Sequence, residues 1–198
     1  RAHLLDSHPL QIEKPDGSQK QLQFTHAILA TGSRPAVPGV FRLETDRIMD
    51  STGALELEEI PATMLVVGGG IIGMELGQVY AALGTRVSVV EMLPGLIPPA
   101  DRDLVKPLHN KIAERFDEIM LNTQVTQVEE TGNGLTVDLR DSTGKTEAKT
   151  YDKILLSVGR IPNSEDIGLE HTAVAIDPRN YVQVDGQLRT AEPSIFAI

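Results

Sequence analysis

The sequence predicts an α/β protein with a parallel sheet into which a three-stranded antiparallel β-meander is inserted. The first observation is that strand patterns at 64–67 and 86–91 alternate with helix patterns at 71–83 and 102–116, as in consecutive βαβ units. The second is the run that follows, with strand patterns at 124–129, 135–140 and 146–150 separated by turn residues. A last apolar strand at 153–158 is expected to return to the parallel sheet.

The residues before this core predict a hairpin and one further strand. The strands 10–13 and 21–24 flank Lys14-Pro15-Asp16-Gly17, where proline presets a turn and glycine accepts a positive φ angle. A short buried strand follows at 27–30 and ends in a tight turn at 31–35. We expect the chain to cross between domains somewhere from Pro35 to Asp50.

One proline complicates the second helix of the core. Pro107 lies inside the pattern at 102–116 and has no amide hydrogen. We therefore expect it to kink this helix, or to start the main body of the helix after a short first piece.

Composition excludes several classes of function. Cysteine is absent, so this chain carries no disulfide, thiolate metal site or thiol redox centre. The net charge of −10 argues against a nucleic-acid partner, because a phosphate backbone requires a basic surface. The sequence has no apolar run near the roughly 18 to 20 residues that cross a bilayer and no signal-peptide pattern. We expect a soluble, cytoplasmic protein with no membrane partner.

The glycine-rich run Gly68-Gly69-Gly70-Ile71-Ile72-Gly73 is the strongest functional signal. It directly follows one predicted strand and opens a helix, which is the context of a dinucleotide-binding fingerprint in a Rossmann-like sheet. In that pattern Gly68 turns the chain, Gly70 lets a pyrophosphate approach the backbone, and Gly73 lets helix and strand pack closely. The phosphates would lie at the helix N-terminus, which needs no basic side chain. The alternative is that these glycines only form a βα turn.

Glu91 points to the kind of dinucleotide. It ends the second predicted strand, where a carboxylate can accept hydrogen bonds from the adenosine ribose and would repel a 2′-phosphate. No arginine follows directly, so NAD is favoured over NADP. The alternative for Glu91 is a solvated carboxylate at a strand end.

Four segments carry a resemblance to a known family. The stretches 50–55, 61–75, 89–92 and 158–163 resemble the dihydrolipoamide dehydrogenases, which are class I pyridine nucleotide-disulfide oxidoreductases. The resemblance implies a partial FAD-binding domain at 1–48, an NAD-binding domain at 49–184, and a returning FAD-domain segment, truncated, at 185–198. Because the chain starts without methionine and stops in an apolar run, one residue before the family's Gly-Asp pair, both ends are expected to be cuts.

The same resemblance implies roles for individual residues. Glu75 would lie near the contact of flavin and nicotinamide and pair with a lysine outside this chain, or else simply face solvent. Gly159 would let nicotinamide approach the sheet edge, or only end a strand. Val125 would pack beside adenine, or belong to the core. The remaining expected contacts are Gly69, Ile71, Ile72, Val158 and Arg160 for NAD, and Thr31, Gly32 and Ser33 for FAD; Arg160 and Asn163 could equally only pair within the loop.

Catalysis cannot be assigned to any residue of this chain. The family's FAD fingerprint, redox cysteines and His/Glu pair are all absent from it. The resemblance implies a full-length homodimer that uses FAD and NAD to oxidise dihydrolipoamide on the lipoyl domains of 2-oxo acid dehydrogenase complexes. Another NAD(P)H-dependent flavin disulfide reductase, or a non-catalytic dinucleotide-binding module, are the alternatives. The five histidines show no metal-ligand spacing, so we expect no metal.

Overall fold

A computed structural model describes residues 1–198, which form two compact units: 1–34 together with 160–198, and 35–159. The cofactor-binding domains expected at 1–48, 49–184 and 185–198 stay a prediction beside these two units. Residues 160–184 belong with the first unit because their backbone packs on its first strand. The Leu4 amide donates to the Ile167 carbonyl at 2.8 Å, and a Cβ on Gly168 would lie 2.0 Å from the Leu4 carbonyl oxygen.

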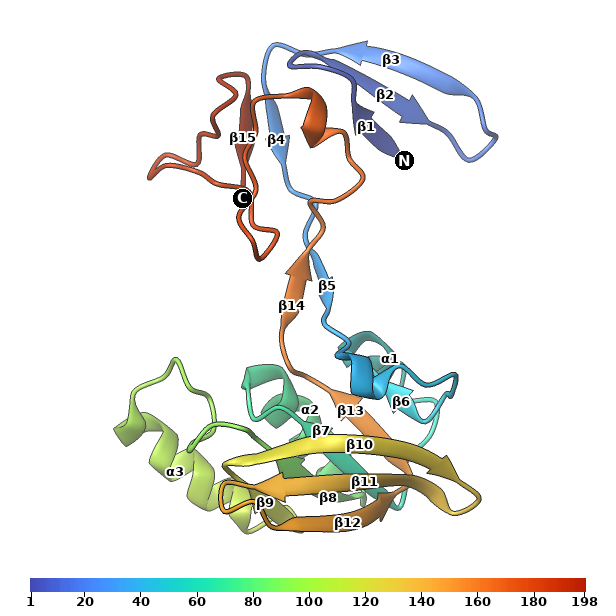
Figure 1. Ribbon diagram of the computed structural model, residues 1–198, viewed down its shortest axis with the longest axis vertical. Coiled ribbons are helices and arrows are strands. Elements are labelled where there is room, and N and C mark those ends of the chain that lie inside the picture. The colour runs from blue at the N-terminus through green and yellow to red at the C-terminus, as the bar shows by residue number, and fades with distance from the viewer. The chain divides into compact units, whose positions relative to one another are not determined.

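A five-stranded parallel sheet forms the centre of the second unit (Figure 1). Its strands, in spatial order, are β6 (Ile48–Met49), β13 (Lys153–Leu156), β7 (Thr63–Val67), β8 (Arg86–Val90) and β9 (Glu118–Met120). Every neighbouring pair is parallel, which confirms the expected sheet. The two edge strands β6 and β9 were not expected, because two or three residues are too few to show a periodicity.

Three helices accompany this sheet: α1 (Ser51–Glu56), α2 (Ile71–Ala82) and α3 (Arg102–Ala113). Helix α1 was not expected, although Asp50 is a typical N-cap residue and its carboxylate accepts the amides of Thr52 and Gly53. Since α3 runs through Pro107, the expectation that its main body starts after a short first piece is wrong, whereas a kink at the proline stays a prediction. A proline removes one backbone hydrogen bond, whereas packing of the apolar side stabilises the whole helix.

The three helices and the meander cover opposite faces of the sheet. Strand side chains alternate, so Met64 and Val66 join the cluster that contains helix residues, whereas Leu65 and Val67 join the cluster of the meander. The meander consists of β10 (Thr123–Thr131), β11 (Gly134–Asp141) and β12 (Thr146–Tyr151), all antiparallel as expected. A short 3₁₀ helix, η1 (Gly39–Phe41), adds buried Phe41 to the meander side.

The first unit contains an antiparallel sheet of β1 (Ala2–Leu4), β2 (Pro9–Glu13) and β3 (Gln19–Gln23), which includes the expected hairpin. A separate parallel pair joins β4 (Ala27–Leu29) to β15 (Ile195–Ala197). The expectation that 27–30 is a buried strand is wrong: Ile28 is 68% exposed, Ala30 is exposed, and Ala27 and Leu29 are half-buried, because the chain covers only one face of this pair. The 3₁₀ helix η2 (Leu169–His171) contributes Leu169 to the core of this unit.

Two further strands, β5 (Ser33–Pro35) and β14 (Arg160–Pro162), pair where the chain passes between the units. None of the helices is long and apolar enough to cross a membrane.

Candidate functional site

The residues expected to bind NAD gather at one edge of the parallel sheet. The glycine-rich loop follows β7, Glu91 follows β8, and residues 157–159 follow β13. Because all three strands are parallel, their carboxyl ends meet at the same edge, which is where ligands bind in open α/β sheets. The sheet topology therefore brings together three segments that lie far apart in the sequence.

The glycines of the loop have different surroundings. Gly68 has φ +102°, and a Cβ there would lie 2.5 Å from the Ser157 carbonyl oxygen. A Cβ on Gly73 would lie 2.4 Å from the Gly68 carbonyl oxygen and 2.5 Å from Ser157 Oγ, so helix α2 could not pack as it does. A Cβ on Gly70 would meet nothing within 4 Å. The expected turn and packing roles of Gly68 and Gly73 are confirmed, and the space beside Gly70 is open.

Glu91 is tied to the glycine-rich loop. Its Oε2 accepts the amide of Gly69 at 2.7 Å, and its Oε1 accepts the amide of Leu93 at 2.8 Å. The side chain is half-buried rather than free in solvent. A carboxylate oxygen offers about two lone-pair sites, so each oxygen can still accept a further hydrogen bond in a fixed orientation. No sequence pattern indicates these two backbone contacts.

Ser157 is a residue that sequence reasoning missed. Its Oγ lies 2.9 Å from the carbonyl oxygens of both Val67 and Gly68, and its amide donates to Val67. The hydroxyl thus joins the end of β13 to the turn of the glycine-rich loop. Its position directly after an apolar strand, two residues before Gly159, was the only signal in the sequence.

Helix α2 presents a mixed surface at its start. Ile72 packs against the core, whereas Ile71 is 58% exposed. Glu75 is exposed and forms no ion pair within residues 1–198, as both alternatives require, so its role stays a prediction. Further along, the Tyr80 hydroxyl donates to the Ala54 carbonyl at 2.9 Å, and burial raises the pKa of this phenol. That hydrogen bond fixes α1 against α2.

Three further residues expected to contact NAD are Val158 and Gly159, which follow β13, and Val125, which lies in β10. Val158 is 38% exposed, and Gly159 has φ +118° with no atom within 4 Å of a Cβ position. Val125 is only 8% exposed and lies in the cluster of the meander, which favours its core interpretation.

The segment expected to contact FAD is held by residues of β14 and just after it. Arg160 donates through Nε to the Ser33 hydroxyl and through Nη2 to the Ser33 carbonyl. The Asn163 amide donates to the Gly32 carbonyl, and its Nδ2 donates to the Thr31 carbonyl, both at 3.0 Å. Arg160 and Asn163 therefore form hydrogen bonds within the chain, as the alternative to a ligand contact had it.

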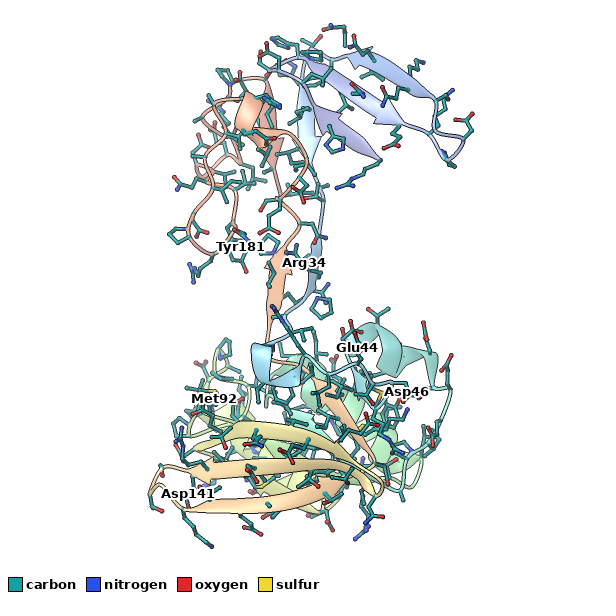
Figure 2. All side chains as sticks on the ribbon, turned by 45° about the vertical axis from the view of Figure 1, so that its right-hand side comes forward. Arg34, Glu44, Asp46, Met92, Asp141 and Tyr181 are labelled. Atoms are coloured by element: carbon teal, nitrogen blue, oxygen red, sulfur yellow. The ribbon has the colours of Figure 1, made fainter.

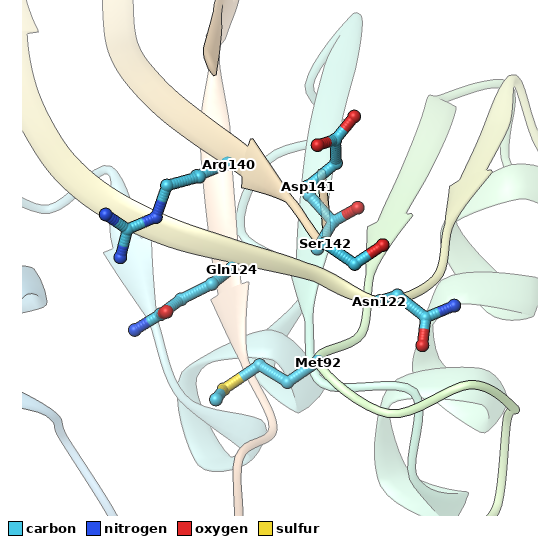
Figure 3. Close-up of a pocket in the computed structure, with 7 residues that line it drawn as sticks. Met92, Asn122, Gln124, Arg140, Asp141 and Ser142 are labelled. Atoms are coloured by element: carbon cyan, nitrogen blue, oxygen red, sulfur yellow. The ribbon is translucent and has the colours of Figure 1, made fainter. Parts of the chain in front are cut away.

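A pocket of about 250 Å³ is lined by Met92, the residue that follows Glu91 in the chain (Figure 3). The Glu91 carbonyl accepts the Thr123 amide at 3.0 Å. This hydrogen bond holds the first residue of β10, which lines the pocket, against the backbone of Glu91. Gln124 and Arg140 are cross-strand partners and point to the same side as Met92 (Figure 3). Met92, which Figure 2 also labels, is 65% exposed. The lining residues are Met92, Asn122, Thr123, Gln124, Arg140, Asp141 and Ser142. No sequence pattern had indicated these residues as a group.

The histidines do not form a cluster. His8, His26 and His171 are exposed, and His3 and His109 are half-buried. His8 Nδ1 lies 3.1 Å from the Phe24 carbonyl oxygen.

A glycine-rich loop between a buried parallel strand and a helix, with an acidic residue at the end of the next strand, defines a Rossmann-type α/β protein. The family model described as pyridine nucleotide-disulphide oxidoreductase matches residues 4–198, and the chain belongs to that family. It is 44% identical over 183 residues to dihydrolipoyl dehydrogenase of Vibrio parahaemolyticus, covering 92% of this chain and 38% of the relative. It is 42% identical over 197 residues to dihydrolipoyl dehydrogenase of Haemophilus influenzae, covering 100% and 41%.

Two solved structures have a similar fold. LpdA from Mycobacterium tuberculosis superimposes with a TM-score of 0.87 at 28% identity, covering 100% of this chain and 43% of the other. The HOCl-induced flavoprotein disulfide reductase RclA from Escherichia coli has a TM-score of 0.87 at 25% identity, covering 100% and 44%. The chain thus spans about 40% of the length of the curated relatives it matches.

Proposed function

We propose that this chain is the NAD-binding part of a flavoprotein oxidoreductase of the dihydrolipoyl dehydrogenase type. In the complete reaction, dihydrolipoamide and NAD⁺ give lipoamide and NADH through FAD and a redox disulfide that lie outside this chain. The identity of 42–44% to dihydrolipoyl dehydrogenases, against 25% to the flavoprotein disulfide reductase RclA, favours this activity over that of another flavin disulfide reductase. For the complete protein we propose a cytoplasmic homodimer that acts on lipoyl domains of 2-oxo acid dehydrogenase complexes.

The observation that carries NAD binding is the contrast among the glycines. Gly68 and Gly73 are required by contacts within the chain, whereas the missing Cβ of Gly70 leaves open space at the N-terminus of α2. Backbone amides and the helix dipole at that point compensate a pyrophosphate without a basic side chain, in keeping with a net charge of −10. The chain therefore offers a cradle that a side chain would fill.

Glu91 would hold the adenosine ribose of NAD. Its two backbone hydrogen bonds orient the carboxylate, and the remaining lone pairs can accept from both ribose hydroxyls. The adjoining pocket of Met92, Gln124 and Arg140 would receive the adenine end. Gly159 would leave room for the nicotinamide end at the neighbouring strand. When bound, NAD⁺ serves as the hydride acceptor from reduced flavin.

FAD would be contacted at Thr31–Ser33, as the family resemblance implies. The carbonyls of these three residues already accept from Arg160 and Asn163, so this chain holds the turn in shape from within. Amide and hydroxyl groups, rather than carbonyls, would then be the contacts to the cofactor.

The test is a calorimetric titration of the chain with NADH and, in parallel, with NADPH. We expect NADH to bind more tightly, because the Glu91 carboxylate repels a 2′-phosphate. Glu91→Arg should weaken NADH binding and improve NADPH binding. Unchanged relative affinities in this variant would contradict the role of Glu91, and binding of neither nucleotide to the unmodified chain would contradict NAD binding by this unit.

A further inference from the structure

The loop that joins β8 to α3, residues 91–101, forms hydrogen bonds with both the backbone amide and the backbone carbonyl of Gly69 in the glycine-rich loop. The Gly69 amide donates to Glu91 Oε2 at 2.7 Å, and the Gly69 carbonyl accepts the Ile97 amide at 2.8 Å. A Cβ on Gly69 would lie 2.6 Å from Cδ2 of Leu96, which is fully buried. The orientation of Gly69 within the fingerprint therefore depends on where this loop is held.

Ile97 sits in an unfavourable backbone conformation. Its φ angle is +45°, in the left-handed region that a β-branched residue rarely adopts. Pro98 follows it and restricts its backbone further. Such a conformation persists only where the surrounding structure holds it.

Arg102, the first residue of α3, stabilises this conformation through hydrogen bonds to the loop. Its Nη1 donates to the Leu96 carbonyl at 2.9 Å, and its Nη2 donates to the carbonyls of Ile97 and Ala100, both at 2.6 Å. Nε adds a bond to the Ala100 carbonyl at 3.1 Å. The guanidinium forms no ion pair with a carboxylate, so all its contacts within the chain serve this loop.

We propose that Arg102 is a positioning residue for the dinucleotide: its guanidinium holds Leu96, Ile97 and Ala100 so that Ile97 fixes Gly69 in the fingerprint. The inference rests on the proposed NAD site, but it assigns a role to a residue outside the glycine-rich motif. Arginine suits this task because its planar group carries five donors in a fixed arrangement. A lysine ammonium is a compact point charge and cannot span three separated carbonyls in the same way.

Two variants separate positioning from charge. Arg102→Met removes the donors and keeps a long apolar stem, and Arg102→Lys keeps the charge without the planar group. Arg115→Met is the matched control, because this substitution removes the same charge from an exposed residue just beyond the end of α3. For each variant we would measure the NADH dissociation constant by calorimetry, hydrogen exchange of the Ile97 amide, and thermal unfolding.

We expect both Arg102 variants to bind NADH about tenfold more weakly, a typical size for a residue that acts on a site without touching the ligand. Exchange of the Ile97 amide should accelerate in both, while amides of β7 and β8 stay protected and Arg115→Met behaves as the unmodified chain.

Full NADH affinity in Arg102→Lys would overturn the proposal in favour of simple attraction between charges. Accelerated exchange with unchanged affinity in both variants would reduce Arg102 to a structural contact of the loop. If the unmodified chain binds neither NADH nor NADPH, the proposed NAD site fails and the role of Arg102 in binding fails with it. The exchange rate of Ile97 would then still show whether the guanidinium holds the loop.

Discussion

Replacing Gly73 or Gly70 by alanine adds the same single carbon to the same glycine-rich loop, with opposite expected effects. At Gly73 the new Cβ would lie 2.4 Å from the Gly68 carbonyl oxygen, 2.5 Å from Ser157 Oγ and 3.0 Å from Val66 Cγ1. Two of these three atoms lie well inside any normal contact distance, and one of them is backbone. Helix α2 must therefore move away from β7.

Such overpacking costs about 3 kcal/mol of the free energy of unfolding, the upper part of the usual range, because a backbone atom cannot rotate away. The corresponding loss in melting temperature is roughly 10 °C for a domain of this size. At Gly70 no atom lies within 4 Å, and the φ angle of −76° suits alanine. The weaker N-cap and the stiffer unfolded chain then offset one another to within about 0.5 kcal/mol.

Urea unfolding followed by circular dichroism would measure both free energies, and calorimetry would measure NADH affinity. We expect Gly73→Ala to be the less stable variant and Gly70→Ala to keep its stability but lose NADH binding, because its Cβ would occupy the open space at the N-terminus of α2. Equal unfolding free energies would refute the packing role of Gly73. Unchanged NADH affinity in Gly70→Ala would refute the proposed approach of the pyrophosphate.

Two further predictions concern single hydrogen-bonding groups. Tyr80→Phe should lower the free energy of unfolding by about 1 kcal/mol, because the Ala54 carbonyl loses its donor, whereas exposed Tyr181→Phe should change it little; chemical unfolding of both variants checks this. The Thr143 hydroxyl is the main cause that lowers the pKa of Asp141 below its ordinary value. The ionised carboxylate should therefore stabilise the turn above roughly pH 4, and this contribution should be lost as the pH falls through the lowered pKa. Carboxyl NMR titration would measure that pKa, and an ordinary value would contradict the contact.

Much of the second unit could be predicted from the sequence because its signals are local. Apolar runs of strand length, a helix pattern and turn residues at Asn133-Gly134 depend only on neighbours in the chain. The glycine-rich loop was equally readable, because the surroundings of Gly68, Gly70 and Gly73 follow from their order after a strand. Helix α1 was within reach too, since Asp50 is a capping residue, but six residues give too short a pattern.

Other features were decided by the tertiary structure alone. The edge strands β6 and β9 exist because a longer strand offers its free edge to two or three residues. Exposure of Ile28 depends on which parts of the chain cover the pair β4–β15, which no local pattern records. The unit boundary after residue 159 follows from contacts with Leu4, more than 150 residues away in the chain.

The sequence by itself determined the class of the fold and the segment that marks its dinucleotide loop, because strand and helix periodicity and glycine spacing are properties of consecutive residues. Only the tertiary structure decided how the loop is held. Ser157 Oγ donates to the Gly68 carbonyl, and Gly69 is hydrogen-bonded to the Glu91 carboxylate and the Ile97 amide. Arg102 in turn donates to the Ile97 carbonyl. Hydrogen bonds between such residues depend on where parallel strands end in space, and spacing along the chain does not encode that position.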